Sequence, residues 1–263
     1  MLIEKVKTVL HCSPHKAGSQ WIKSIVKDPL FTQITGYQYF DYVSTLPDKV
    51  DYRHIMERYF ERPLPEYSIV STLFIGYDNY KKLPGVGPFR AFYVLRDPRD
   101  VLVSYFFSQK YSHPLNPKVQ SFRQQLKDVD VFDGLNISLK RLLDCGTYDA
   151  MKSWMVSAKD DNTVLLVRFE DLIGADKCLF FKKIFDHCGF TLSNDIVCAL
   201  LAKYSFSNLT KEREQGIEDC HHHYRKGVAG DWKNYFNHEM ASIFMEKTGA
   251  LLSILGYEEF END

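Results

Sequence analysis

The sequence predicts a single α/β domain in which helices flank a central parallel sheet. Short apolar runs such as residues 91–95 and 163–169 have the length and composition of strands buried on both faces. Stretches with helical spacing separate these runs. No internal repeat, low-complexity tract or flexible linker divides residues 1–263. We therefore expect one domain, with ligands bound where the carboxyl ends of the strands open into loops.

The first half of the chain alternates between the two patterns. Three apolar runs are expected to be strands: residues 6–11, 67–74 and 91–95. Three stretches are expected to be helices: residues 21–27, 51–61 and 98–109. The first of these helices should end at Asp28-Pro29, because proline disfavours helical geometry in the residue before it.

The second half is expected to be mostly helical around one strand, residues 163–169. The helical patterns lie within residues 119–145, 148–158, 176–188, 195–203 and 239–255. The polar stretch 211–224 has neither pattern and is expected to be the most mobile loop.

The composition is that of a globular protein, with 45% hydrophobic and 25% charged residues. A net charge of −1 argues against a nucleic-acid binder, so any anion site must be a local cluster of cations. No stretch approaches the roughly 20 apolar residues of a membrane span. The first ten residues carry three charges, which is typical of a strand and not of a signal peptide. We expect a cytoplasmic protein.

The six cysteines are scattered, without a Cys-x-x-Cys pair. That spacing predicts free, mostly buried thiols and neither a disulfide framework nor a zinc site. Cys188 and Cys198 fall in helical patterns and are expected to fill the core. The full set is Cys12, Cys145, Cys178, Cys188, Cys198 and Cys220.

Residues 225–233, Arg-Lys-Gly-Val-Ala-Gly-Asp-Trp-Lys, form the most informative segment. Two cations precede a Gly-x-x-Gly turn, where the backbone can approach a ligand without interference from Cβ atoms. Such a pattern suits a phosphate, because charge-assisted hydrogen bonds to it are worth about 1.5–3 kcal/mol each. A solvated basic loop is the alternative.

Residues 13–21, Ser-Pro-His-Lys-Ala-Gly-Ser-Gln-Trp, connect the first expected strand to a helix. The helix start supplies N–H groups and a partial positive charge, and Lys16 adds a full one. The nucleoside-triphosphate motif G-x-x-x-x-G-K-[ST] is absent, so no Ser or Thr is placed to hold Mg²⁺. An ordinary strand-to-helix turn is the alternative.

A third segment follows the strand at residues 91–95. Arg96 should lie at the carboxyl edge of the sheet, while Asp97 caps the next helix and Pro98 occupies its first turn. Ser104 should lie on that helix near the same edge. The alternatives are a salt bridge from Arg96 to Asp97 or Asp100, and a merely polar face at Ser104.

Together the three segments resemble the cytosolic-type sulfotransferases, which use 3′-phosphoadenosine 5′-phosphosulfate (PAPS). The family motifs are P-K-S-G-T-T-W, R-(D/N)-P-(R/K)-D-x-x-V-S and R-K-G-x-x-G-D-W-K. The counterparts here are residues 15–21, 96–104 and 225–233, and the likeness extends over about residues 6–240. The resemblance implies a fold like that of P-loop nucleotide kinases, PAPS as co-substrate without a metal, and a small-molecule or lipid acceptor.

The resemblance also assigns site residues. Lys16 matches the lysine that contacts the 5′-phosphate and the bridging oxygen. Residues 167–172 and 204–206 resemble the family's V-x-Y-E-D-L and T-S-F, which implies that Phe169 and Phe206 face the adenine; core packing is the alternative for both rings. The implied nucleotide-site residues are Lys16, Ala17, Gly18, Ser19, Gln20, Trp21, Arg96, Ser104, Phe169, Phe206, Arg225, Lys226 and Gly227.

The sequence departs from the family where the catalytic histidine is expected. The family's K-T-H-L-P corresponds here to residues 71–75, Ser-Thr-Leu-Phe-Ile. Other candidates for the general base are His113, which matches a position that lines the acceptor pocket, Asp78, His15 and His11. A non-catalytic nucleotide-binding protein and a nucleotide kinase are alternative functions.

Two further departures concern the C-terminal third. The family's K-x-x-x-T-V-x-x-x-E dimer motif is absent, since Asn237, His238 and Ser242 stand at its key positions, so the oligomeric state stays open. Residues 220–223, Cys-His-His-His, could suggest a metal, but side chains in an extended loop diverge, and we expect a solvated loop.

Overall fold

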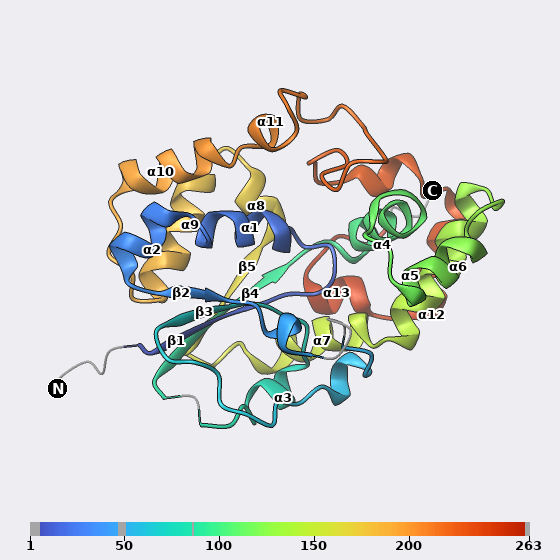
Figure 1. The fold of residues 1–263 in the computed structure, drawn as a ribbon. Coiled ribbons are helices and arrows are strands. Elements are labelled where there is room, and N and C mark those ends of the chain that lie inside the picture. Colours follow the sequence, from blue (N-terminus) through green and yellow to red (C-terminus); the bar gives the residue numbers. More distant parts are fainter. Residues whose placement is uncertain (1–5, 47–50, 86, 261–263) are drawn as a thin grey trace.

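A five-stranded parallel sheet forms the centre of the computed structural model, which describes residues 6–46, 51–85 and 87–260 (Figure 1). Its strands are β1 (Thr8–Cys12), β2 (Gln38–Phe40), β3 (Ser68–Leu73), β4 (Phe89–Leu95) and β5 (Val164–Arg168). The order across the sheet is β2-β3-β1-β4-β5. The four strands predicted from apolar runs are confirmed, whereas β2, a three-residue edge strand, was not predicted.

Side chains of each strand alternate between two hydrophobic cores. Leu10 and Tyr93 face one core, and their chain neighbours Val9 and Phe92 face the other. Successive residues of a strand point to opposite faces, so a strand buried on both sides must be apolar throughout. This burial explains why the strands appear in the sequence as continuous apolar runs.

Helices cover both faces of the sheet (Figure 1). One face packs against α1 (Ser19–Val26), α2 (Pro29–Thr35), α9 (Lys177–His187) and α10 (Asn194–Lys203). The other packs against α4 (Pro98–Phe107), α6 (Val131–Asp144), α7 (Thr147–Ser157), α12 (His238–Thr248) and α13 (Leu251–Leu255). The shorter elements are α3 (Tyr77–Tyr80), α5 (Pro117–Gln125), α8 (Phe169–Ile173), α11 (Phe206–Leu209), the 3₁₀ turns η1 (Tyr42–Thr45), η3 (Ile55–Glu57) and η5 (Asp231–Asn234), and the π-helical turn η4 (Ser108–Ser112).

The predicted helix at residues 51–61 is wrong. Only the three-residue turn η3 forms there. Side chains satisfy the backbone instead: Arg58 donates to the carbonyls of Asp51, Arg53 and Phe74. Hydrogen bonds from a side chain to nearby backbone groups compete with helix formation.

Two helix boundaries also differ from the prediction. Residues 239–255 form two helices, because Gly249 with φ of 57° ends α12 before α13 begins. Asp28 does more than end α1: its carboxylate accepts a hydrogen bond from Leu30 N at 2.8 Å and caps α2, with Pro29 in the first turn.

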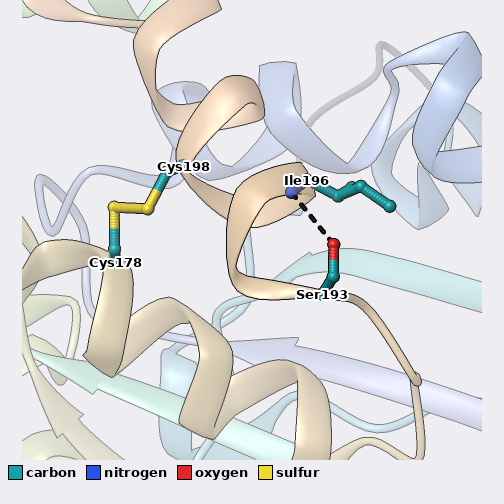
Figure 2. The surroundings of a disulfide bond; sticks show 4 residues. All are labelled: Cys178, Ser193, Ile196 and Cys198. Atoms are coloured by element: carbon teal, nitrogen blue, oxygen red, sulfur yellow. Dashed lines mark hydrogen bonds between the residues drawn. A yellow bond between two sulfur atoms is a disulfide. The ribbon is translucent and has the colours of Figure 1, made fainter.

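Cys178 and Cys198 form a disulfide that joins α9 to α10 (Figure 2), so the prediction of free thiols is wrong for these two residues. The helices pack side by side and bring the two Cα atoms to 5.5 Å. In the same view Ser193 accepts a hydrogen bond from Ile196 N at 3.3 Å and caps α10. Cys188 is fully buried, as predicted, and its thiol is free.

None of the helices within the described ranges combines the length and the apolar character needed to cross a lipid bilayer.

Candidate functional site

A cavity of about 660 Å³ lies where the chain leaves the carboxyl ends of β1, β4 and β5. The segments after these strands contribute Lys16, Arg96 and Phe169 to its wall. Residues from 205 to 228 complete the enclosure. The three segments singled out in the sequence therefore meet at one site.

The turn after β1 has a backbone that few residues adopt. Lys16 has φ of 65° and Gly18, the N-cap of α1, has φ of 77°. A Cβ atom on Gly18 would lie 2.7 Å from the Phe169 ring, so the close approach of β1 and β5 loops requires glycine here. Gly18, Ser19 and Gln20 line the cavity at the positive end of α1. Ala17 is fully buried in the hydrophobic core and is not among the residues that line the cavity.

Arg96 connects the first and third segments. Its Nη1 donates to the carbonyl of Lys16 at 2.8 Å, and its Nη2 donates to that of Val228 at 3.3 Å. The guanidinium stacks 4.5 Å from the centre of the Phe169 ring. Its Nε is buried without a partner among the described residues. The predicted alternative of a salt bridge to Asp100 exists as a long 3.8 Å contact, so it does not exhaust the charge of Arg96.

Asp97 caps α4 as predicted. Its carboxylate accepts a hydrogen bond from Arg99 N at 2.9 Å and pairs with the Arg99 guanidinium at 2.8 Å. Pro98 occupies the first turn, where its missing N–H is harmless. The helix carries Ser104 to the cavity wall.

Arg225 and Lys226 line the cavity from the third segment. Lys226 Nζ lies 2.6 Å from the buried carboxylate of Asp231, and Arg225 pairs with Asp231 and Glu218. The loop is held against α4, because Asp100 accepts hydrogen bonds from the N–H groups of Gly230 and Trp232 at 2.7 and 2.9 Å. A polar residue of α4 thus positions both cations at the cavity.

Aromatic rings form part of the same wall. Trp21 is half-buried and its Nε1 donates to the carbonyl of Tyr204 at 2.8 Å. Phe206 is half-buried over Gly227, whereas Phe169 is 6% exposed beneath Arg96. The wall of the cavity brings these three rings together, and Phe169 also packs in the second core.

Lys16 lies among other cations. Burial, together with the positive charges of Arg96 and Arg225, lowers the pKa of Lys16 to about 8. Three cations facing one cavity repel each other, and an anion bound among them would relieve that repulsion. The electrostatics around Lys16 favour an anionic ligand.

Two histidines close to Lys16 are neutral at pH 7. Burial lowers the pKa of His113, and the charge of Lys16 contributes. His113 Nδ1 lies 3.1 Å from the carbonyl of Pro114; a carbonyl only accepts, so Nδ1 carries the proton and Nε2 is the basic nitrogen. Burial and the charge of Arg58 lower the pKa of His15 to about 3, and its ring lies 4.4 Å from that of Phe74.

The other two candidate bases lie elsewhere. Asp78 is exposed on α3 and is not among the residues that line the cavity. His11 is fully buried in β1, bonds to Ser71 Oγ at 2.8 Å and stacks on Phe92 at 4.7 Å. Of the four candidates, the cavity therefore contains His113 and His15.

The three consecutive histidines diverge, as the sequence predicts. His221 contacts the Tyr111 ring at 5.4 Å, and His222 Nδ1 accepts from Tyr224 N at 3.1 Å. His223 alone lines the cavity, and burial lowers its pKa to about 4.

Arg58 and Asp51 are further wall residues that were not predicted from the sequence. Both lie in the segment predicted to be a helix, and that prediction gave no reason to place their side chains at the cavity. Several charged residues precede the buried strand expected at residues 67–74. The sequence does not indicate, however, whether their side chains point toward the cavity.

Residues 7–256 match the model of the sulfotransferase domain family, so the chain belongs to that family. Among its relatives is Flavonol 3-sulfotransferase of Flaveria bidentis, which is 27% identical over 266 residues. That match covers 89% of this chain and 80% of the relative.

Two solved structures share the fold. Mouse sulfotransferase SULT7A1, complexed with PAP, matches with a TM-score of 0.64 at 21% identity, over 94% of this chain and 84% of that one. Retinol dehydratase, in complex with androsterone and the inactive cofactor PAP, matches with a TM-score of 0.60 at 19% identity. That match covers 93% of this chain and 80% of the retinol dehydratase chain.

Proposed function

We propose that the protein transfers the sulfuryl group of PAPS to a hydroxyl or amine of a small-molecule or lipid acceptor. The observation that carries this proposal is the position of Arg96, which hydrogen-bonds the backbone of both the Lys16 turn and the 225–228 segment at one cavity. Membership of the sulfotransferase family and the names of the relatives support it.

The residues fit such a nucleotide. The unpartnered Nε of Arg96 and the lowered pKa of Lys16 are both features that an anionic ligand would satisfy. Lys16 and the start of α1 would hold the 5′-phosphosulfate, and Arg96, Ser104, Arg225, Lys226 and Gly227 the 3′-phosphate. The rings of Trp21, Phe169 and Phe206 would enclose the adenine.

PAPS supplies a sulfuryl group attached to a phosphate leaving group. Lys16 and the N–H groups beside it provide positive charge where negative charge would develop on the bridging oxygen. One such preorganised donor is worth roughly 3 kcal/mol of barrier. No metal is required for this role.

His113 would act as the general base. Its Nε2 carries the lone pair, and its lowered pKa keeps it unprotonated at neutral pH. His15 is the second candidate because it lines the same cavity. Asp78 now serves as a matched control, since it lies outside the cavity wall.

Transfer of radiolabelled sulfate from PAPS to a panel of alcohols, phenols and amines tests the proposal. We expect wild type and Asp78→Ala to be active, and His113→Ala to lose about 100-fold or more in kcat/KM. If His113→Ala keeps full activity and His15→Ala loses it, the base is His15. If wild type binds adenosine 3′,5′-bisphosphate (PAP) but transfers to no acceptor, the chain is a non-catalytic nucleotide-binding protein.

A further inference from the structure

Arg58 lines the cavity but is not among the residues proposed to hold the nucleotide. Its Nη1 donates to the carbonyl of Phe74 at 3.0 Å, and the Phe74 ring packs against the His15 ring in a tilted arrangement, with the ring centres 4.4 Å apart. His15 directly precedes Lys16, the residue at the proposed transfer point. Burial lowers the pKa of His15, and Arg58 is near enough for its charge to lower that pKa further. Both residues line the cavity.

Among the residues that the structure describes, Arg58 shares its nearest carboxylate, Asp51, with Arg53. Asp51 lies nearby, but its oxygens accept hydrogen bonds from Arg53 Nε at 3.0 Å, Arg53 Nη2 at 2.7 Å and the Tyr42 hydroxyl at 2.7 Å. Arg58 Nε is 3.8 Å from the same carboxylate. Counting the described residues alone, two guanidinium groups share one carboxylate, which leaves one positive charge uncompensated.

Arg58 also retains hydrogen-bonding capacity. A guanidinium has five N–H donors. Three of those of Arg58 are directed to the carbonyls of Arg53, Asp51 and Phe74, at 3.2, 3.1 and 3.0 Å. Within the described part of the chain, one N–H on each terminal nitrogen is left over. A pair of this kind matches the two oxygens of a carboxylate.

Arg58 is only 6% exposed, and it is one of the residues that line the cavity. A buried charge that shares its counter-ion with a second cation is incompletely compensated, so such a group beside a ligand cavity is suited to an anionic ligand. The cavity wall includes the apolar residues Val43, Phe74 and Leu115 as well as polar ones such as His15 and Asp51.

We infer that the acceptor of this enzyme carries an oxyanion, such as a carboxylate, in addition to its reacting hydroxyl, and that Arg58 recognises it. The inference rests on the proposed function. The acceptor class is thus an alcohol or phenol with an apolar body and a negatively charged end. Lys16, Arg96, Arg225 and Lys226 do not take this role, because the nucleotide would occupy them.

Equilibrium binding to the PAP-loaded protein tests the inference without requiring turnover. The probes are 4-hydroxyphenyl alkanoic acids of increasing chain length, each compared with its carboxamide of the same shape. We expect at least one acid to bind about 10-fold or more tightly than its carboxamide, since charge-assisted hydrogen bonds are lost in the neutral analogue. If no acid in the series exceeds its carboxamide by that factor, the inference is wrong.

Two variants locate the effect. In Arg58→Gln the ratio of the affinity for the acid to that for the carboxamide should fall toward one. In Arg90→Gln this ratio should stay as in the wild-type protein. Arg90 lies at the start of β4, at the other end of the strand from the cavity. Retention of the preference in Arg58→Gln would show that Arg58 is not the recognition group. If Arg58→Gln does not fold, the comparison of ligands on the wild-type protein decides.

The same experiment separates the two proposals. A protein that does not bind PAP at all refutes the proposed function and the inference with it. A protein that binds PAP and transfers sulfate equally well to acids and carboxamides keeps the function and loses the inference.

Discussion

Lys16 is held in a partly strained and electrostatically unfavourable state. Its backbone is left-handed, and its ammonium shares the cavity with Arg96 and Arg225. Burial and these two charges lower the pKa of Lys16 to about 8, which makes the cation easier to lose than an ordinary lysine. The arrangement is tolerable because an anionic ligand would stabilise the charged form.

From this we predict that PAP binding takes up a proton at mildly alkaline pH. Free Lys16 is partly deprotonated at pH 8.5, and phosphate contacts raise its pKa again, so the bound state holds more protons. Affinity should therefore fall as the pH rises through about 8. Calorimetry at pH 8.5 in buffers of different ionisation enthalpy measures the uptake, and Lys16→Met should abolish it.

His113 should determine how kcat/KM depends on pH on the acidic side. The base must be neutral, and the pKa of His113 lies below its ordinary value of 6.5 because of burial and the charge of Lys16. We predict that kcat/KM stays level at neutral pH and falls only as the pH drops below 6.5. A fall that is already complete at pH 7, or one that persists in His113→Ala, contradicts the assignment of His113.

At the scale of elements, the loop at residues 225–230 depends on two left-handed glycines with different surroundings. Gly227 has φ of 72°, and a Cβ atom there would overlap the Phe206 ring. Gly230 has φ of 74°, with nothing within 4 Å of such an atom. At both positions a non-glycine residue would have a backbone penalty of about 1–2 kcal/mol. Only at Gly227 would its Cβ atom also collide with the Phe206 ring.

Gly227→Ala should consequently weaken PAP binding by about 10-fold or more, because the loop and the Phe206 ring cannot keep their contact. Gly230→Ala serves as its control and should change the affinity only a few-fold. Both can be measured by calorimetry, with thermal unfolding to check the fold. Equal effects of the two substitutions would mean that the Phe206 contact is unimportant for the nucleotide.

Elements with strong local signals were predictable from the sequence. The cap by Asp97, the four apolar strands and most helices follow from hydrophobic period and capping residues. The segment at residues 51–61 was not predictable, because the hydrogen bonds of Arg58 to carbonyls as distant as Phe74 replace helical ones. The disulfide between Cys178 and Cys198 depends on how two helices pack, which their spacing does not indicate.

The site was predictable in part for a related reason. The motifs at residues 15–21 and 96–104 follow strands and could be placed at one sheet edge from that pattern, whereas residues 225–233 follow no strand and were placed by the resemblance. The approach of Arg58 and His223 to that edge comes from irregular segments, whose course no periodic pattern describes.

For the whole molecule, strand order explains why distant motifs meet. β1 lies next to β4, and β4 next to β5, with all strands parallel. Their carboxyl ends therefore share one edge, and Lys16, Arg96 and Phe169 become neighbours although they are 73 to 153 positions apart in the chain. The 225–228 segment is added by the hydrogen bond from Arg96 to Val228.

Calorimetric titration of the wild-type protein with PAP and with adenosine 5′-monophosphate, without Mg²⁺, tests whether the cavity binds both phosphates of the nucleotide. We predict that PAP binds at least about 100-fold more tightly than adenosine 5′-monophosphate, because charge-assisted hydrogen bonds to the 3′-phosphate are worth about 1.5–3 kcal/mol each. Equal affinity for the two nucleotides, or no binding of PAP, would contradict it.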